Sequence, residues 1–300
     1  MIPVSIGVKI LEFTGMLSLL GKALSPLMKL VGLPGATGIV WASAMLSNIY
    51  GGMIAFASIQ GSITLTTAQV TVLSLMMLLA HTFPIELQVA YRAGVRLPVI
   101  FAIRFGFALL AGIILNAIYT YCDWGQSIST FSWIPKEGNK GLDTWLWAEL
   151  ERYCYVIIAI FCLLLVMRLL KVSGILDLLS KALAPILGVL GISKTVIPMT
   201  VIGLTTGLLY GGALIIKETE EKEIAKLDIF YAMVLMGLCH ALIEDSILMI
   251  SLGADVLGVV VFRIAFAVIT TFIIVRVVKK MDVKVAEKLL TRQIKKDKKN

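Results

Sequence analysis

The sequence has little of what enzymes use for chemistry. Only two histidines and four cysteines occur in 300 residues. The cysteines have neither zinc-ligand spacing nor a disulfide framework, and no His-Glu-x-x-His motif, serine-nucleophile signature or phosphate-binding loop is present. We therefore expect that the protein is not an enzyme and that it holds no cofactor and no structural metal ion.

Charge is also scarce. Charged residues make up 15% of the chain and hydrophobic residues 59%, with a mean hydropathy of +0.94. A chain this apolar cannot hide its hydrophobic residues in one soluble core, and runs such as 256–275 approach the length that crosses about 30 Å of hydrocarbon. The sequence predicts an all-α integral membrane protein in the plasma membrane, with the lipid bilayer as its main partner.

The two ends of the chain differ in charge. Residues 1–13 have no basic start and contain Lys9 and Glu12, so they do not resemble a cleaved signal, and whether they cross the membrane stays open. Residues 279–300 hold nine Lys or Arg and three acids, which supplies most of the net charge of +8. A polybasic run directly after a membrane helix is typical of a cytoplasmic end near anionic lipids. We expect a cytoplasmic tail over 281–300 and no nucleic-acid partner.

One unit occurs twice in the chain. The segment 19–26 recurs as 178–185, an offset of 159 residues, and both copies read Leu-Leu-x-Lys-Ala-Leu-x-Pro. The two histidines, His81 and His240, have the same offset, as do Arg104 and Arg263. Matching His, Arg and Pro residues in one order are not easily accidental, so the sequence predicts a structural repeat.

Each copy is expected to contain the same kinds of segment. An amphipathic helix that lies in the membrane interface is followed by a re-entrant helical hairpin and by transmembrane helices. The predicted parts are a first repeat over 1–120, an extracytoplasmic Trp-rich loop over 121–152, a second repeat over 153–280 and the tail over 281–300. The predicted hairpins are 35–60 and 194–217, and the full spans are 67–91, 98–120, 153–170, 228–252 and 255–278.

The topology follows from counting crossings. If the interfacial helices do not cross and the hairpins return to their own side, three crossings separate the start of one copy from the start of the next, so the second copy is inverted. A cytoplasmic carboxyl end then also places Arg92, Arg96 and the 217–226 loop inside, as the positive-inside rule requires. The four tryptophans of 121–152 then lie outside.

Small polar residues stand in the middle of each predicted hairpin. Polar groups at that depth suit two half-helices whose exposed backbone lines a cavity, whereas a continuous helix with small packing residues is the alternative. We expect these residues to bind a solute. They are Ser47, Asn48, Tyr50, Thr205, Thr206 and Tyr210.

Two acid–arginine pairs are expected between the last two spans of each copy. Glu86 and Arg104 are equally distant from Val95 in sequence, and Asp245 and Arg263 are related in the same way. Antiparallel helices joined by a short turn place such residues side by side, and Arg holds a carboxylate with two parallel hydrogen bonds. The sequence predicts two structural salt bridges, with a role in substrate binding as the alternative.

Three further ionisable residues stand within spans. An inverted repeat would bring His81 and His240 toward a shared axis at the membrane midplane. Glu244 follows His240 by one predicted helical turn, whereas the first copy has Ile85 at this position. We expect His81, His240 and Glu244 to couple transport to a proton or another cation. Buried packing histidines and a divalent-metal site are the alternatives.

The chain resembles a known family at several points. The Pro-Gly-Ala-Thr-Gly of 34–38, the Asn-Ile-Tyr-Gly-Gly of 48–52 and the order of segments are similar to the nucleoside-recognition or gate domain family. This family includes spore maturation proteins A and B, gate regions of ferrous iron transporters and the core of concentrative nucleoside transporters. The resemblance implies a gate fold. Residues 48–52 lack the Gln and Glu that hold a nucleobase in the nucleoside transporters, so it implies no particular substrate.

These observations predict a secondary transporter of a small polar solute, either nucleoside-like or another small metabolite. Coupling to a proton or another cation is expected. A divalent-metal permeation unit is one alternative, and a non-transporting membrane component of a larger assembly is another. The oligomeric state stays open, with a homo-oligomer as one option.

Overall fold

The structure is a computed structural model. It describes residues 6, 10, 14, 16–59, 63–129, 142–221 and 223–292. Within these residues the secondary structure is helical. No strand is present among them, and the β-type contacts are two isolated bridges. Four described segments are long and apolar enough to cross a membrane, which confirms the prediction of an all-helical membrane protein. These segments are Thr67–Arg92, Leu97–Tyr121, Lys226–Ser251 and Leu257–Lys279.

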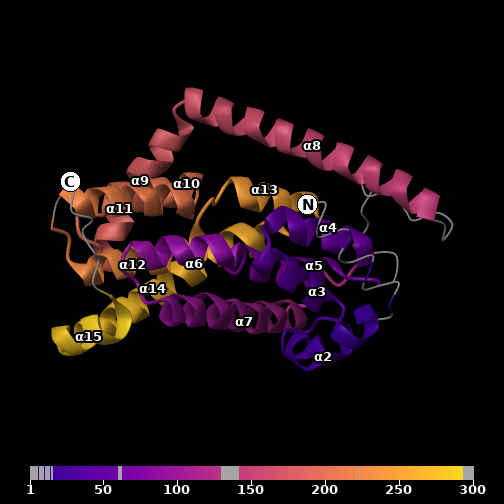
Figure 1. Ribbon diagram of the computed structural model, residues 1–300, viewed down its shortest axis with the longest axis horizontal. Coiled ribbons are helices and arrows are strands. Elements are labelled where there is room, and N and C mark those ends of the chain that lie inside the picture. Colours follow the sequence, from indigo (N-terminus) through magenta and orange to yellow (C-terminus); the bar gives the residue numbers. More distant parts are fainter. Residues whose placement is uncertain are drawn as a thin grey trace.

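Two sets of helices follow one another in the same order. The first set is α2 (Met16–Leu30), α3 (Thr37–Leu46), α4 (Ile49–Ile59), α5 (Thr67–Leu79), α6 (Phe83–Arg92) and α7 (Leu97–Tyr121). The second set is α9 (Ile175–Leu190), α10 (Ile197–Thr206), α11 (Leu208–Glu221), α12 (Lys226–Cys239), α13 (Glu244–Ser251), the π-helix η2 (Leu257–Phe262) and α14 (Arg263–Lys279). The sets share one body in Figure 1.

A long helix, α8 (Leu142–Val172), joins the two sets and runs along one side of the body (Figure 1). It contains the predicted span 153–170. The predicted boundary between loop and second repeat, at 152, falls inside this helix, which begins at Leu142 in a stretch free of Gly and Pro. Trp147 therefore belongs to α8, whereas Trp133 lies outside the described residues.

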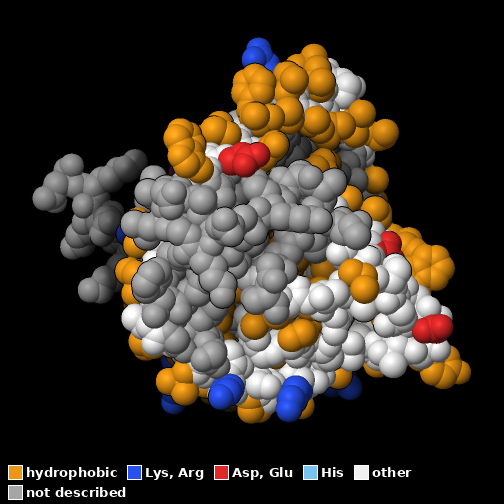
Figure 2. All heavy atoms as spheres, turned by 90° about the vertical axis from the view of Figure 1, so that its right-hand side faces the viewer, with side chains coloured by type: hydrophobic (Ala, Val, Ile, Leu, Met, Phe, Trp, Pro, Cys, Tyr) orange, Lys and Arg blue, Asp and Glu red, His pale blue; other side chains and the backbone are white. Residues whose placement is uncertain are grey.

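The surface of the molecule carries many apolar side chains. On α8, Ile157 is 62% exposed and Phe161 67%. Figure 2 shows hydrophobic side chains gathered at the top of one face and Lys and Arg side chains along its lower edge. Such an exterior suits contact with lipid rather than water.

Each predicted hairpin is two helices rather than one. The first breaks at Ser47 and Asn48, between α3 and α4, and the second breaks at Gly207, between α10 and α11. Helices of 10 to 14 residues are about 15–21 Å long, too short to cross about 30 Å of hydrocarbon. The continuous-helix alternative is therefore wrong for both segments.

Glycine lets the two helices of each hairpin approach closely. A Cβ atom added to Gly211 would lie 2.6 Å from the Cα atom of Gly203. A Cβ atom added to Gly52 would lie 2.8 Å from the Cβ atom of Ala44. The two residues of each pair, Gly203 with Gly211 and Ala44 with Gly52, are equally distant in sequence from the break between their helices. The two helices of each hairpin are therefore antiparallel and in contact.

The predicted spans 67–91 and 228–252 are also interrupted, which the sequence analysis did not foresee. The first is α5 and α6, separated by Ala80, His81 and Thr82, and the second is α12 and α13, separated by 240–243. Thr82 and Ala241, 159 residues apart, both adopt left-handed backbone conformations, with φ of 52° and 44°. Both histidines therefore stand at helix breaks rather than inside helices.

Hydrogen bonds to the hairpins stabilise these breaks. The Thr82 N–H donates to the Ala44 carbonyl at the end of α3, at 2.9 Å. In the second set, the N–H of Ala241 donates to the equivalent carbonyl of Gly203, at 3.4 Å, and Leu242 N–H donates to Leu204 at 2.9 Å. The Ala44 and Leu204 carbonyls, which the end of each hairpin's first helix leaves free, thus gain partners, whereas the Gly203 carbonyl also accepts from the Gly207 N–H at 3.0 Å.

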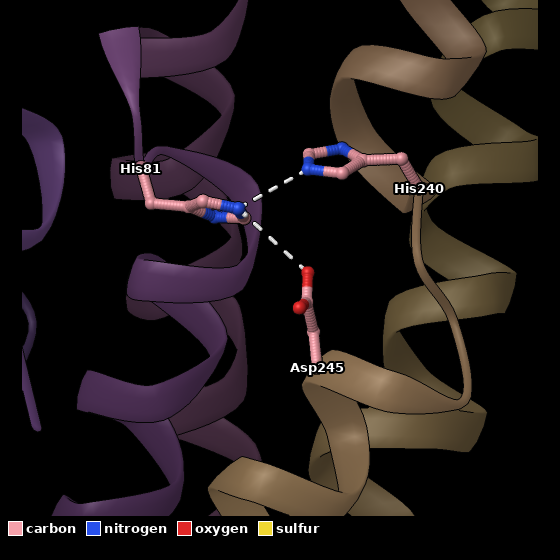
Figure 3. A group of neighbouring side chains, drawn as sticks. All are labelled: His81, His240 and Asp245. Atoms are coloured by element: carbon pink, nitrogen blue, oxygen red, sulfur yellow. Dashed lines mark hydrogen bonds and ion pairs between the residues drawn. The ribbon is translucent and has the colours of Figure 1, made fainter. Parts of the chain in front are cut away.

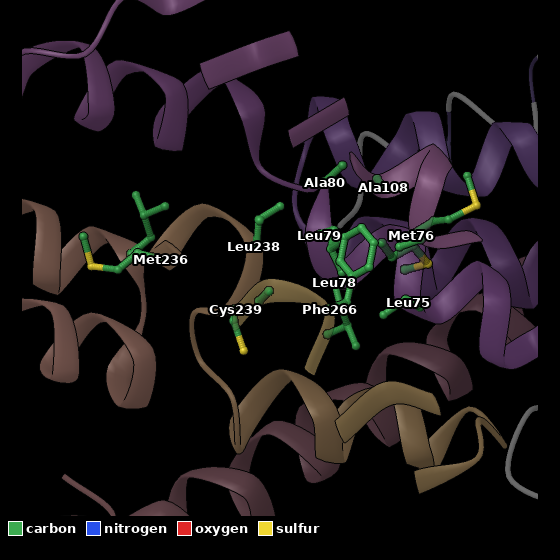
Figure 4. Close-up of a cluster of buried hydrophobic side chains, with 14 of the residues drawn as sticks. Leu75, Met76, Leu78, Leu79, Ala80, Ala108, Met236, Leu238, Cys239 and Phe266 are labelled. Carbon is green, nitrogen blue, oxygen red and sulfur yellow. The ribbon is translucent and has the colours of Figure 1, made fainter. Parts of the chain in front are cut away.

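The core runs through both sets of helices. Leu78 and Leu79 of α5 lie near Leu238 of α12 and Phe266 of α14, and all four side chains are buried (Figure 4). The breaks at the two histidines are thus embedded in an apolar core, where each polar group needs a partner within the protein.

The carboxyl end begins with a docked helix, α15 (Val283–Leu290). Arg96 donates from its backbone N–H to the Leu290 carbonyl and from Nε to the Thr291 carbonyl, both at 3.0 Å. The guanidinium of Arg292 lies 3.9 Å from the ring centroid of Tyr91. The predicted tail is therefore held against the α6–α7 turn up to residue 292, and residues 293–300 lie outside the described part.

Candidate functional site

Four ionisable side chains meet where the two broken helices face each other. His81 comes from the α5–α6 break and Glu86 from α6, whereas His240 comes from the α12–α13 break and Asp245 from α13. All four are buried, with exposed fractions between 2% and 6%. Figure 3 shows His81 pointing toward both His240 and Asp245. The cluster is therefore shared equally by the two sets of helices.

The two histidines face each other through their Nε2 atoms, which are 3.2 Å apart. The Nδ1 atom of His81 lies 2.8 Å from the Met77 carbonyl oxygen, and that of His240 lies 2.8 Å from the Met236 carbonyl oxygen. A carbonyl oxygen only accepts, so each Nδ1 carries the hydrogen. In the neutral rings both Nε2 atoms then present lone pairs to the centre of the cluster. The predicted approach of His81 to His240 is confirmed.

The two acids reach the same centre. Glu86 Oε1 lies 3.1 Å from His240 Nε2 and 3.7 Å from His81 Nε2. Asp245 Oδ2 lies 3.7 Å from His81 Nε2. Four atoms that are acceptors in neutral histidines and ionised carboxylates thus converge on one point, and such an arrangement attracts a cation.

The two arginines lie behind the cluster and are fully buried. Arg104 forms an ion pair from Nη1 to Glu86 Oε2 at 2.5 Å, and it donates to the Leu79 and His81 carbonyls at 3.0 and 3.2 Å. Arg263 donates to the Leu238 and His240 carbonyls at 3.3 and 2.8 Å. Both guanidinium groups therefore bind carbonyls that the helix breaks leave without intrahelical donors.

The two predicted salt bridges have different outcomes. Glu86 and Arg104 are paired, as the antiparallel α6–α7 turn predicts. Between Asp245 and Arg263, both described, the structure has no ion pair within 4.0 Å. Asp is one methylene shorter than Glu, and its Oδ2 turns toward His81 instead.

The predicted pairing of Glu244 with His240 is wrong. Because α12 ends at Cys239 and α13 begins at Glu244, no helical turn connects the two residues. Glu244 is partly buried, and its carboxyl group lies near the hydroxyl group of Tyr50 in α4. Ile85, its counterpart in the first set, is 54% exposed. Glu244 therefore connects α13 to the first hairpin rather than to the histidines.

The predicted solute-binding residues lie at or beside the hairpin breaks. Asn48 Oδ1 accepts from the Gly51 N–H at 2.9 Å, and the hydroxyl groups of Thr205 and Thr206 donate to carbonyls of their own helix. Ser47 is partly buried and Tyr210 is 67% exposed. Their role in binding a solute stays a prediction.

Neither acid of the cluster was predicted to reach the histidines, although Glu86 does pair with Arg104 as expected. The signal that would have found them is simple, because an acid follows each histidine by five residues, as Glu86 follows His81 and Asp245 follows His240. In a continuous helix this spacing does not put two side chains on one face. The break between them brings the acid and the histidine together.

Comparison with known proteins places the chain among membrane proteins. It is 29% identical over 285 residues to the uncharacterized membrane protein YvoD of Bacillus subtilis (strain 168), an alignment that covers 93% of this chain and 89% of that protein. No protein-family model matches the chain, and no solved structure matches it. The similarity to a membrane protein therefore extends over both sets of helices.

Proposed function

We propose that the protein is a secondary transporter of a small polar solute in the plasma membrane, coupled to a proton or another cation. The observation that carries this proposal is the buried cluster of His81, His240, Glu86 and Asp245 at two helix breaks. A charged residue in the middle of a membrane helix costs at least about 2.5–3.5 kcal/mol, and unwound backbone is tolerated only inside protein or beside a cavity. Helix packing alone requires neither feature, whereas binding and release of ions requires both.

The two sets of helices form an inverted repeat in this proposal, and the helix pairs α3–α4 and α10–α11 are re-entrant. Residues on a twofold axis contact their own equivalents. His81 contacts His240, and the ring centroids of Phe107 and Phe266, also 159 residues apart, are 6.2 Å apart. These contacts support a pseudo-twofold axis through the cluster. The amphipathic helices α2 and α9 then lie in opposite interfaces, and the carboxyl end lies in the cytoplasm.

Labelling of single cysteines from each side of the membrane tests this topology. The free cysteines are first replaced by serine, and Lys299→Cys and Ser132→Cys are then compared with a membrane-impermeant reagent. Reaction of the two positions from opposite sides is expected. Reaction from the same side would overturn the inverted topology.

The hairpins are the proposed solute site, and the histidine cluster is the proposed cation site. Thr82 and Ala241, next to the histidines, donate hydrogen bonds to the ends of α3 and α10. A cation that changes the geometry of a break therefore acts directly on a hairpin. The similarity to a membrane protein and the resemblance to gate proteins support this division.

Transport is tested with the full chain in proteoliposomes. Uptake of labelled nucleosides, amino acids and small anions is measured with and without imposed proton and metal-ion gradients, against empty vesicles. We expect one solute class to accumulate only when a cation gradient is present. Absence of uptake across the panel, with correct insertion, would favour a non-transporting component of an assembly, and uptake of metal ions alone would favour a metal permeation unit.

A further inference from the structure

We propose that His81, His240, Glu86 and Asp245 form a four-ligand site for a divalent transition-metal ion of the Zn²⁺ class. The inference deepens the proposed function, on which it rests for the role of the bound cation. The existence of the site is an independent claim, because it follows from the contacts within the cluster and is measured by binding rather than by transport.

The spacing of the ligand atoms fits a four-coordinate ion. With metal–ligand bonds of about 2.0–2.2 Å, the corners of a tetrahedron lie about 3.3–3.6 Å apart. The two His Nε2 atoms are 3.2 Å apart, and Glu86 Oε1 lies 3.1 and 3.7 Å from them. Asp245 Oδ2 lies 3.7 Å from His81 Nε2, and a carboxylate oxygen of Asp245 lies within 4.8 Å of a ring nitrogen of His240. Side-chain rotations would bring each acid to a tetrahedral separation from the two histidines.

The donor set is that of a metal site. Histidines that bind metals usually donate their second ring N–H to a carbonyl or carboxylate, which fixes the orientation of the ring. Both Nδ1 atoms are held in this way, by the carbonyls of Met77 and Met236. Asp245 Oδ2 is buried and has no hydrogen-bond donor among the described residues. A buried carboxylate oxygen without a donor that faces an imidazole lone pair favours a cation between them.

A single proton does not satisfy this arrangement. A proton on His240 Nε2 would make one short hydrogen bond, to Glu86 Oε1 at 3.1 Å or to His81 Nε2 at 3.2 Å. Asp245 Oδ2 would still lie against the ring nitrogen of His81 without a donor. A divalent ion binds all four atoms at once, so the metal explains more of the observed contacts.

Charge and ligand type select the class of ion. Two imidazoles with two carboxylates suit Zn²⁺ and its transition-metal neighbours. Ca²⁺ and Mg²⁺ require six or more ligands, chiefly oxygens, so we expect them to bind poorly. The charges of Arg104 and Arg263 are directed at Glu86 Oε2 and at backbone carbonyls, away from the four ligand atoms.

The site also ties the two halves of the protein together, because each half supplies one histidine and one acid. Without the ion, the bond from Arg263 Nη2 to the Leu78 carbonyl, at 3.3 Å, is one of the contacts that still connect the two helix breaks across this centre. Metal binding is therefore expected to stabilise the folded chain, as any ligand that binds only the native state does.

The first experiment measures metal binding to the full chain. The protein is purified in detergent without a polyhistidine tag, stripped with a chelator and titrated with Zn²⁺ and with Co²⁺. We expect one ion per chain, an intense visible absorption of bound Co²⁺ that indicates four-coordination, and a rise in the thermal unfolding midpoint. Excess Mg²⁺ or Ca²⁺ should not compete. Absence of stoichiometric binding would overturn the proposal.

Two neighbouring acids supply matched variants. Asp245→Asn removes a ligand, and we expect the Zn²⁺ affinity to fall at least about tenfold. Glu244→Gln removes the adjacent carboxylate, which lies near Tyr50 and not at the four ligand atoms, and we expect the affinity to change less than about twofold. Equal losses in the two variants would show a general attraction of cations by acids and would overturn the site.

A spectroscopic measurement on the wild-type chain decides the matter if the variants fail to fold. X-ray absorption of the Zn²⁺-loaded protein should show four nitrogen or oxygen ligands with scattering from two imidazole rings. A sulfur ligand would instead point to Cys239, a buried free cysteine next to His240, and would overturn the ligand set. Solute uptake by a chain that binds no metal would overturn this inference alone, whereas metal binding without solute uptake would overturn only the proposed function.

Discussion

The two halves of the protein share their architecture but differ in how they hold the central acid. In the first half, Glu86 is anchored by Arg104 and shares its second oxygen with the histidines. In the second half, Asp245 faces His81, and Arg263 donates hydrogen bonds to backbone carbonyls instead of pairing with the acid. The duplication has therefore kept the helix breaks, which backbone hydrogen bonds determine, while the side-chain partners have diverged.

The helices that carry the two arginines differ in the same way. Arg104 lies in the regular helix α7, whereas Arg263 follows the π-helix η2. A π segment adds a residue to a turn and changes the direction of the side chains that follow, often at functional sites. In the first half the acid is anchored by its arginine, whereas in the second half the acid faces a histidine and has no ion pair with the equivalent arginine.

The largest difference is expected from removal of the arginines. Arg104→Gln leaves Glu86 buried without its partner and should destabilise the fold by about 3–5 kcal/mol. Arg263→Gln loses hydrogen bonds to carbonyls, but it leaves no acid without an ion-pair partner. We therefore expect a smaller loss of folding stability, about 1.5–3 kcal/mol. Thermal and denaturant unfolding in detergent measure both effects.

The double variant Glu86→Gln with Arg104→Gln is the control for this interpretation. It should be more stable than Arg104→Gln alone, because no buried charge remains unpaired. Equal losses for Arg104→Gln and Arg263→Gln would contradict the difference between the halves.

The hairpins should respond to an added methyl group in unequal measure. The Cβ atom of Gly211→Ala would meet the backbone of Gly203, which cannot move away, whereas that of Gly52→Ala would meet the flexible end of Met77 as well as the Ala44 side chain. Overpacking costs about 1–3 kcal/mol, and we expect Gly211→Ala near the upper end and Gly52→Ala near the lower. Unfolding midpoints check the order, and a larger loss for Gly52→Ala would contradict it.

Shortening Glu86 should make the first half resemble the second. In Glu86→Asp the carboxylate no longer reaches both Arg104 and His240, and we expect a loss of about 1–2 kcal/mol from the weakened ion pair and one missing buried methylene. A crystal or cryo-EM structure of the variant should show Arg104 bonded to carbonyls alone, as Arg263 is. If the shortened carboxylate still formed an ion pair with Arg104 in that structure, side-chain length would not be the cause of the difference.

The smallest effect is expected at the equivalent tyrosines of the two hairpins. Tyr50→Phe removes the hydroxyl group that lies near Glu244 and should cost at most about 1 kcal/mol. Tyr210 is 67% exposed, so Tyr210→Phe should change stability by less than about 0.5 kcal/mol. Unfolding measurements on both variants would contradict this assignment if Tyr210→Phe had the larger effect.

Much of the architecture could be predicted from residue types and their repetition. The apolar composition predicted a membrane protein, and Ser47 with Asn48 correctly marked the break of the first hairpin. The break at His81 had one signal in the sequence, Pro84 in the first turn of α6, whereas the break at His240 had none, because neither glycine nor proline occurs over 240–243. The left-handed residues there are Thr82 and Ala241, and they are held by tertiary hydrogen bonds to the hairpins.

The sequence by itself determined which residues belong together as equivalents. The offset of 159 residues identified His81 with His240 and Arg104 with Arg263 before any contact was known. The sequence also shows charged residues within apolar segments of membrane-spanning length. Because a charge is costly in lipid, these residues were expected to be paired or functional.

Only the tertiary structure decided the partners. Glu244 looked like the companion of His240 because a continuous helix puts residues four apart on one face, yet the break turns α13 away and sends Glu244 to Tyr50. The acids that reach the histidines are Glu86 and Asp245, five residues beyond them. Helical periodicity predicts neighbours only where the helix continues, and in this protein the backbone unwinds at the two positions that carry the histidines.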